Sequence, residues 1–216
     1  MLILILAVWC GAAFAALPMR AVAAEKTPAN QPTILVLGDS LSAGYGLDAQ
    51  VGWVSLLQSK LKAEGFPHRV ANASISGDTT SGGLARLPAA LDRNQPQIVL
   101  IELGGNDGLR GLPLKAMREN LSTLVDKARA GGAQVLLFEI MIPPNYGAAY
   151  TKGFSDSFKQ VAEAKQVPLV PFFLLPLVGK DGAFQDDGIH PSAASQPLML
   201  EAVWPRLEPL LKTLNP

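Results

Sequence analysis

Short apolar runs alternate with longer segments in which apolar side chains recur every three or four positions. The short runs predict buried strands, and they cover residues 33–37, 69–72, 97–102, 135–138 and 169–170. The longer segments have helical spacing, as in the stretch that carries Trp53, Leu57 and Leu61 before Gly65. They predict helices over residues 52–64, about 81–92, 114–130, 150–165 and about 193–211. Strands and helices therefore alternate along the chain.

This alternation predicts a parallel sheet with helices on both faces, because each strand must return to the same edge through a crossover. Neither an internal repeat nor a linker follows residue 32. We therefore predict one α/β domain, a three-layer α/β/α sandwich around a five-stranded parallel sheet. In a flavodoxin-like strand order, 2-1-3-4-5, the first three strands are neighbours, and the turns after them meet where ligands bind in such sheets.

Composition limits the partners of this domain. The chain has 216 residues, 49% of them hydrophobic, which is enough for one substantial core. Eighteen basic residues balance 18 acidic ones, and no basic cluster is present, so nucleic acid is not an expected partner.

The first 24 residues differ from the rest, because an aliphatic run is followed by small residues that end in an alanine-rich stretch. This pattern predicts a signal peptide, cut after Ala23 or Ala24, and an exported, periplasmic or secreted domain over residues 25–216. Cleavage would remove Cys10, the only cysteine, and would leave no stable membrane anchor. An uncleaved anchor is disfavoured, because the apolar run is short and interrupted. We expect the mature chain to be a monomer.

Candidate chemistry follows the first three predicted strands. Ser40 supplies a hydroxyl at the end of the first strand, Gly77 an approachable backbone amide after the second, and Asn106 a carboxamide donor after the third. A lone serine in this position is equally typical of a helix N-cap, so the other residues decide between the two interpretations.

A histidine near the C-terminus could complete a nucleophilic site. His190 has Asp187 three residues before it, and a carboxylate there can orient an imidazole and stabilise its protonated form. Asp186 is the alternative carboxylate. The other histidine of the mature chain, His68, has no acidic residue near it in the sequence and is interpreted as structural.

Four blocks of the sequence carry a resemblance to a known family. They are Gly38-Asp39-Ser40-Leu41, Gly77, Gly104-x-Asn106-Asp107 and Asp187-x-x-His190. In this order and spacing they resemble the SGNH (GDSL) hydrolases. Further segments between residues 71 and 147, and residues 185–191, resemble the TesA type, which comprises periplasmic thioesterases, lysophospholipases and arylesterases.

The resemblance implies a role for each of these positions. Ser40 is expected to be the nucleophile, His190 the base and Asp187 its orienting carboxylate. The amides of Ser40 and Gly77 and the side chain of Asn106 are expected to form the oxyanion hole. The implied activity is hydrolysis of esters and thioesters (aryl esters, acyl-CoA, lysophospholipids) through an acyl-enzyme, with neither a cofactor nor a metal.

Apolar residues in the loops favour an acyl chain as the bound group. The expected substrate contacts are Leu109, Leu112, Met141, Ile142 and Tyr146, with 172–178 as a further apolar stretch. Residues 108–113 follow the expected oxyanion donor. Two interpretations of this segment are open: a glycine-hinged loop that closes on the acyl chain, and a rigid connector whose leucines cap the next helix. Arg110 would then lie near solvent, within reach of a phosphate or CoA group.

Other interpretations are weaker or remain open. The stretch from Gly44 to Ala49 resembles a dinucleotide-binding fingerprint but lies too far beyond its strand. Ser40 lacks a Gly-x-Ser-x-Gly context, and two separated histidines do not suggest a zinc site. A carbohydrate esterase of the same fold and a non-catalytic secreted binding module remain alternatives.

Overall fold

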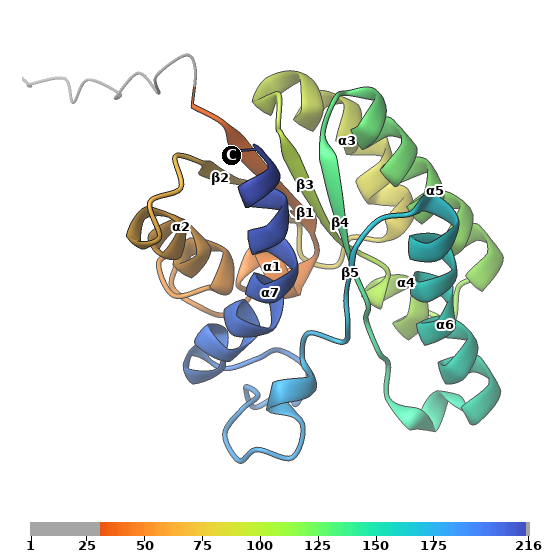
Figure 1. Ribbon diagram of the computed structural model, residues 1–216. Coiled ribbons are helices and arrows are strands. Elements are labelled where there is room, and N and C mark those ends of the chain that lie inside the picture. The colour runs from red at the N-terminus through yellow and green to blue at the C-terminus, as the bar shows by residue number, and fades with distance from the viewer. Residues whose placement is uncertain (1–30, 215–216) are drawn as a thin grey trace, which may run out of the picture.

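The computed structural model describes residues 31–214 as a single parallel sheet between two layers of helices (Figure 1). Its strands lie in the order β2-β1-β3-β4-β5, so the predicted fold and strand order are confirmed. The strands are Thr33–Gly38 (β1), Arg69–Asn72 (β2), Ile98–Glu102 (β3), Gln134–Phe138 (β4) and Leu169–Val170 (β5). The predicted signal peptide lies outside the described residues.

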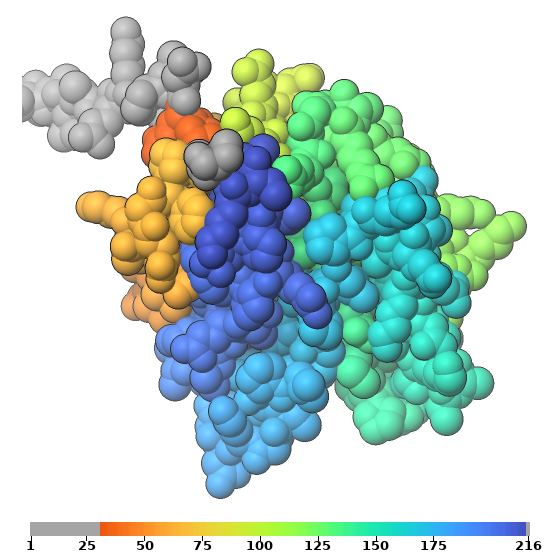
Figure 2. Space-filling model, in the orientation of Figure 1, coloured from red at the N-terminus to blue at the C-terminus, as the bar shows by residue number. Residues whose placement is uncertain are grey.

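The longer helices divide between the two faces of the sheet. One face carries Trp53–Ala63 (α2) and Gln196–Leu214 (α7), and the other carries Thr80–Asn94 (α3), Leu114–Ala130 (α5) and Ala148–Lys165 (α6). Figure 2 shows α7 in dark blue across the surface of the first face. No helix of residues 31–214 is long and apolar enough to span a membrane.

Each face of the sheet has its own apolar core because successive side chains of a strand point to opposite sides. On β1, Leu35 and Leu37 pack toward α3 and α5, whereas Ile34 and Val36 pack toward α2 and α7. All four side chains are fully buried. Because β1 and β3 are covered on both faces, they are continuously apolar rather than alternating.

Short helical turns occupy several loops. They are Ser40–Ala43 (α1), Gly105–Leu109 (α4), Pro144–Tyr146 (η1), Leu175–Leu177 (η2) and Ala193–Ser195 (η3). Helix α4 corrects the prediction of a plain turn after β3. It begins after Gly104, which has a φ of +118°, a conformation that favours glycine. A Cβ at this position would lie 2.9 Å from the ring of Phe158, so the absence of a side chain leaves room for that ring. The segment between β5 and α7 projects as a lobe beyond the carboxyl ends of the strands (Figures 1 and 2).

Candidate active site

The end of β1 places a serine at the start of a one-turn helix. Asp39 is the N-cap of α1, and its Oδ1 accepts a hydrogen bond from the backbone N–H of Leu41 at 3.0 Å. Ser40 is the first helical residue and is partly exposed at the carboxyl edge of the sheet. The helix ends at Gly44, which is in the left-handed conformation that glycine adopts without strain.

The projecting lobe brings a histidine to this serine across 150 positions of sequence. Nε2 of His190 lies 2.9 Å from Oγ of Ser40, and Nδ1 lies 2.6 Å from Oδ2 of Asp187. A tight turn holds the pair, because the backbone N–H of Gln185 donates to the carbonyl of His190 at 2.8 Å, and Gly188 turns with a φ of +67°. Asp187, rather than Asp186, therefore contacts the imidazole.

The Asp187 carboxylate is strongly favoured in its charged form. Its Oδ1 accepts the backbone N–H groups of His190 and Ile189, each at 2.9 Å. The His190 amide first, then the imidazole of His190 and the Ile189 amide, lower the pKa of Asp187 to about 2. At neutral pH this side chain is an anion fixed beside Nδ1, the arrangement that orients an imidazole as a base toward Ser40.

Asn106 reaches the same edge from helix α4. Its Nδ2 donates to Oδ2 of Asp39 at 3.0 Å and to the carbonyl of Asp78 at 2.9 Å, which uses both of its N–H groups. The neighbouring Asp107 is buried and pinned to the N-terminus of α3, because its carboxylate accepts from both the backbone N–H and the hydroxyl of Thr80. The carboxamide is therefore fixed in place, and a substrate oxygen must take an N–H from one of two existing acceptors.

The backbone amides of Ser40 and Gly77 have no such competition, because neither donates a hydrogen bond within residues 31–214. Gly77 has a φ of +79° and lies in an exposed turn, next to the residue whose carbonyl accepts from Asn106. It does not line the cavity described below.

Two buried carboxyl groups lie beside the segment that carries the nucleophile, a feature that the sequence analysis missed. Asp39 is 2% exposed and Glu102 is fully buried at the end of β3, opposite Gly38 in the strand register. Oε2 of Glu102 lies 2.6 Å from Oγ of Ser42 and 3.4 Å from the backbone N of Asp39, while its Oε1 has no hydrogen-bond partner in the described part of the chain. The sequence did offer a signal for Glu102, because it is an acidic residue at the end of the otherwise apolar strand β3.

Burial without a compensating cation shifts both groups toward their neutral forms. No lysine or arginine of residues 31–214 forms an ion pair with either carboxyl. Burial raises the pKa of Asp39 to about 6, and burial together with the charge of Asp39 raises the pKa of Glu102 well above its ordinary value. Of the two groups, Glu102 is therefore the one that keeps its proton when Asp39 is ionised.

Arg86 ties the turns of the site together, and its role was also missed. Its guanidinium pairs with the Asp78 carboxylate at 2.7 Å, donates to the Gly38 carbonyl at 3.1 Å and also donates to the Ala73 carbonyl. One side chain from α3 thus braces the ends of β1 and β2 and the loop that accepts from Asn106.

A cavity of about 520 Å³ opens beside Ser40, Asn106 and His190, and its lining is mainly apolar. Leu109, Met141 and Ile142 line it as expected contacts would, whereas Leu112 and Tyr146 do not. The remaining apolar lining comes from Leu41, Ile140, Pro143, Phe172, Leu174, Phe184 and Ile189.

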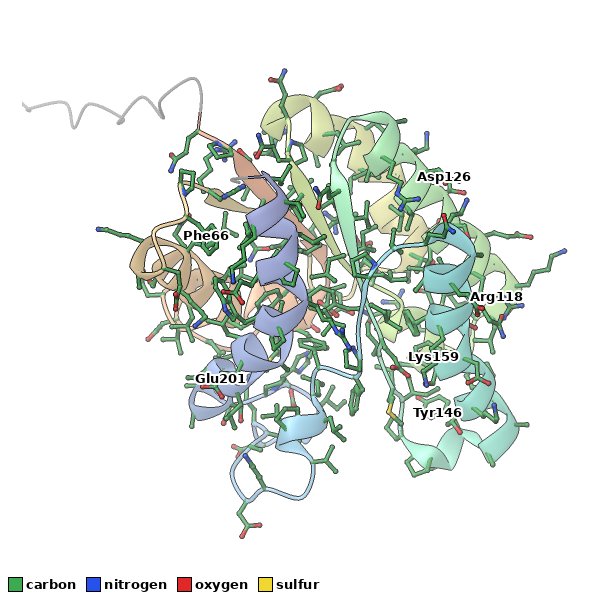
Figure 3. All side chains as sticks on the ribbon, viewed as in Figure 1. Phe66, Arg118, Asp126, Tyr146, Lys159 and Glu201 are labelled. Carbon is green, nitrogen blue, oxygen red and sulfur yellow. The ribbon has the colours of Figure 1, made fainter. Side chains whose placement is uncertain are left out.

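Tyr146 lies instead outside this cavity, near the start of α6 (Figure 3). Its hydroxyl donates to the carbonyl of Leu109 at 2.9 Å, and the hydroxyl of Tyr150 donates to the carbonyl of Leu112 at 3.1 Å. These two tyrosines therefore hold the segment after Asn106 in place through its backbone carbonyls.

Of the two interpretations of residues 108–113, the one with a hinge at Gly108 is wrong. Gly108 is a buried residue of α4, and a Cβ there would lie 2.5 Å from the ring of Phe154, so close packing requires the glycine. Arg110 is exposed as expected, and its Nη2 donates to the carbonyl of Gly77 at 2.7 Å. This bond joins the segment after Asn106 to the turn that carries the Gly77 amide.

Residues 31–214 contain no group of three or more histidine, cysteine or acidic side chains that could hold a metal ion.

Comparisons with known proteins place this chain in a family. Residues 36–196 match the family model of the GDSL-like lipase/acylhydrolases. The chain is 56% identical to esterase TesA of Pseudomonas aeruginosa over 179 residues, which cover 83% of this chain and 89% of the relative. It is 44% identical to thioesterase 1/protease 1/lysophospholipase L1 of Escherichia coli K12 over 195 residues, 90% of this chain and 89% of the relative.

A solved structure is also closely similar. The psychrotrophic esterase EstA of Pseudoalteromonas, crystallised with monoethylphosphonate as inhibitor, superposes with a TM-score of 0.79 at 48% sequence identity. The match covers 85% of this chain and 99% of that structure.

Proposed function

This chain belongs to the GDSL-like lipase/acylhydrolase family, and we propose that it hydrolyses acyl esters and thioesters with Ser40 as the nucleophile, His190 as the base and Asp187 as its orienting carboxylate. One observation carries the proposal. Asp187, His190 and Ser40 form a continuous hydrogen-bonded chain, with steps of 2.6 and 2.9 Å, at the mouth of an apolar cavity. A cleft, a nucleophile, a base and an orienting group together satisfy the geometric requirements for acyl transfer.

In the first half-reaction, Oγ of Ser40 attacks the acyl carbonyl while Nε2 of His190 takes the hydroxyl proton. The Asp187 carboxylate stabilises the resulting imidazolium through Nδ1. When the tetrahedral intermediate collapses, the bond to the alcohol or thiol breaks, and Nε2 returns the proton to this leaving group. The acyl group remains on Ser40 as an ester.

In the second half-reaction, water attacks the acyl-enzyme carbonyl as Nε2 removes its proton. Collapse of the second intermediate releases the carboxylic acid and returns a proton to Oγ of Ser40. Asp187 stays ionised throughout, because its low pKa makes protonation at neutral pH unfavourable.

The negative oxygen of each intermediate is assigned to three donors: the amides of Ser40 and Gly77 and the carboxamide of Asn106. The two amides are unengaged within residues 31–214, which supports their assignment. Asn106 must release one existing acceptor, and we assign this to the neutral carbonyl of Asp78, since the Asp39 carboxyl is the stronger acceptor when ionised.

The substrate class follows from the cavity and from the relatives. Apolar lining favours an acyl chain over a sugar, whose hydroxyl groups would need polar partners, so the carbohydrate esterase is the weaker alternative. Relatives are named as an esterase, an arylesterase and a thioesterase/lysophospholipase. We therefore assign aryl esters, acyl thioesters such as acyl-CoA, and lysophospholipids as substrates. We also propose that the enzyme is a monomer.

The test combines turnover with covalent labelling. Ser40→Ala and His190→Ala are expected to lower kcat on p-nitrophenyl butyrate by about three orders of magnitude or more, with circular dichroism unchanged. An organophosphonate should label the wild type once per chain, on Ser40. Ser59→Ala, which removes the hydroxyl of an exposed serine on α2, is the matched control and should retain turnover and labelling. Near-wild-type turnover by Ser40→Ala would overturn the assignment, and so would labelling elsewhere.

We further propose that the protein is exported and processed. The alanine-rich end of the apolar N-terminal run supports cleavage after Ala23 or Ala24. Expression of the full chain in a Gram-negative host, followed by N-terminal sequencing of the periplasmic fraction, should find Ala24 or Glu25 as the first residue. An intact Met1 on the periplasmic protein would contradict cleavage.

A further inference from the structure

The segment that directly follows the nucleophile's helix covers one face of the histidine. Tyr45 directly follows Gly44, the C-cap of α1, and its ring centroid lies 4.4 Å from that of His190, with the two planes inclined by 36°. Ser40, five residues earlier, contacts Nε2 of the same imidazole at 2.9 Å. One short stretch of chain thus touches the base at its edge and over its face.

The backbone around Tyr45 is fixed to the lobe that carries the histidine. Nε2 of Gln185 donates to the carbonyl of Tyr45 at 2.8 Å, while the backbone N–H of Gln185 donates to the carbonyl of His190 at 2.8 Å. Gly46 makes this approach possible, because a Cβ there would lie 2.3 Å from Oε1 of Gln185. The two segments are therefore held together independently of the aromatic contact.

The two glycines on either side of Tyr45 explain the motif that resembled a dinucleotide fingerprint. Gly44 and Gly46 both have positive φ, +73° and +74°, so they turn the chain sharply on both sides of the tyrosine. This double turn directs the segment from α1 toward Gln185 and His190 rather than around a phosphate group.

The charge that develops on His190 during acylation needs stabilisation from this partly open site. Two carboxylates act on the ring: Asp187 at Nδ1, and Asp39 through its charge from the end of β1. The side chain of Asp187 is 38% exposed, so water weakens its attraction. Two hydroxyl-bearing side chains, Ser40 and Tyr45, also contact the imidazole, and within residues 31–214 the ring contact to His190 is made by Tyr45.

We propose that Tyr45 is a positioning residue that holds the imidazole of His190 and stabilises its protonated form in the transition state. The face of an aromatic ring attracts a cation within about 6 Å, and the attraction is stronger for imidazolium than for neutral imidazole. The proposal rests on the assignment of His190 as the base. Tyr45 does not touch the reacting carbonyl and acts only through the histidine.

The experiment compares Tyr45→Leu with Tyr45→Phe. Leucine keeps apolar bulk but removes the aromatic face, whereas phenylalanine keeps the face and removes the hydroxyl. Because Tyr45 is 52% exposed, neither change disturbs the core, and thermal denaturation verifies this. The measurements are kcat and kcat/KM on p-nitrophenyl butyrate, from about pH 5 to pH 9.

Tyr45→Leu should lower the plateau of kcat about threefold and move the midpoint of the acidic limb of kcat/KM about half a pH unit toward lower pH. The sign follows because a base whose protonated form is less stable loses its proton more readily. Tyr45→Phe should restore both values toward the wild type. Asp187 and Asp39 are unchanged in both variants, so their titration cancels in the comparison.

A lower plateau with an unmoved midpoint would overturn the proposal, since simple misalignment predicts that result. An unchanged profile for Tyr45→Leu, or equal losses in the two variants, would overturn it as well. Failure of the proposed function is recognised separately, because it requires turnover by Ser40→Ala. An inactive Ser40→Ala beside an unchanged Tyr45→Leu refutes only the role of Tyr45.

Discussion

Replacing Asp39 with asparagine should make the protein less sensitive to pH between about pH 4 and pH 7. Asp39 is 2% exposed, lies beside Glu102 and has a pKa raised by burial to about 6 from its ordinary value of 3.8. An acid whose pKa is raised on folding favours the native state below its unfolded pKa and loses that contribution as pH rises through its folded pKa. The wild type should therefore lose stability across this window because of Asp39.

The size of this loss follows from the two pKa values. Each pH unit between 3.8 and about 6 costs about 1.36 kcal/mol, since the unfolded chain has released the proton and the native state still holds it. The total is on the order of 3 kcal/mol. Asparagine still caps α1 through its Oδ1, but it loses the acceptor for Asn106, at a constant cost of about 1 kcal/mol.

Urea denaturation at about pH 4 and pH 7 measures the effect as a difference of differences, in which the constant cost cancels. Relative to the wild type, Asp39→Asn should gain on the order of 3 kcal/mol of unfolding free energy between the two pH values. Asp92→Asn, which removes an exposed carboxylate of α3, is the control and should give a difference that is flat with pH. A flat difference for Asp39→Asn would show that the buried carboxyl is not neutralised as its surroundings require.

Three further changes test the oxyanion donor, the packing of α4 and the acyl site. Asn106→Ala should lower kcat on an aryl ester by about 10²- to 10³-fold with little change in KM, and an effect confined to KM would assign this residue to ground-state binding. Gly108→Ala should lower the unfolding free energy by about 1–3 kcal/mol, because the new methyl group meets the ring of Phe154, and an unchanged urea midpoint would contradict this packing. Leu109→Ala should flatten the rise of kcat/KM with acyl length in a series of p-nitrophenyl esters, since each buried methylene is worth about 0.8 kcal/mol. Leu112 lies outside the cavity, so Leu112→Ala is the control and should leave this rise unchanged. Equal profiles for the two leucine variants would move the acyl site elsewhere.

The regular elements and their order could be predicted because they depend on the pattern of apolar residues along the chain. Four apolar residues in succession on β1 need burial on two faces, and that requirement already implies a parallel sheet between helices. The predicted boundaries of β2 and α5 coincide with the observed ones. The short helix α4 could not be predicted, because a five-residue helix has too few positions to display a period and depends on the packing of Gly104 and Gly108.

The sequence by itself determined which chemical groups this protein can bring to a reaction: a hydroxyl after the first strand, a carboxamide after the third, and an imidazole with a carboxylate three residues before it. Their local spacing favoured Asp187 as the partner of His190 but left Asp186 open, and the folded turn decided for Asp187, whose Oδ2 lies 2.6 Å from Nδ1 of His190. The contact between His190 and Ser40 depends instead on the lobe before α7, which folds back across 150 positions.

Only the tertiary structure decided the surroundings of these groups. It placed Glu102 beside Asp39, Tyr45 over His190 and Arg86 between three turns, through contacts that no local pattern encodes. Burial and distance, which shift pKa values and stabilise charge, arise when strands pair and layers pack. The reactive side chains can therefore be identified from the sequence, whereas packing determines the protonation states and orientations in which they act.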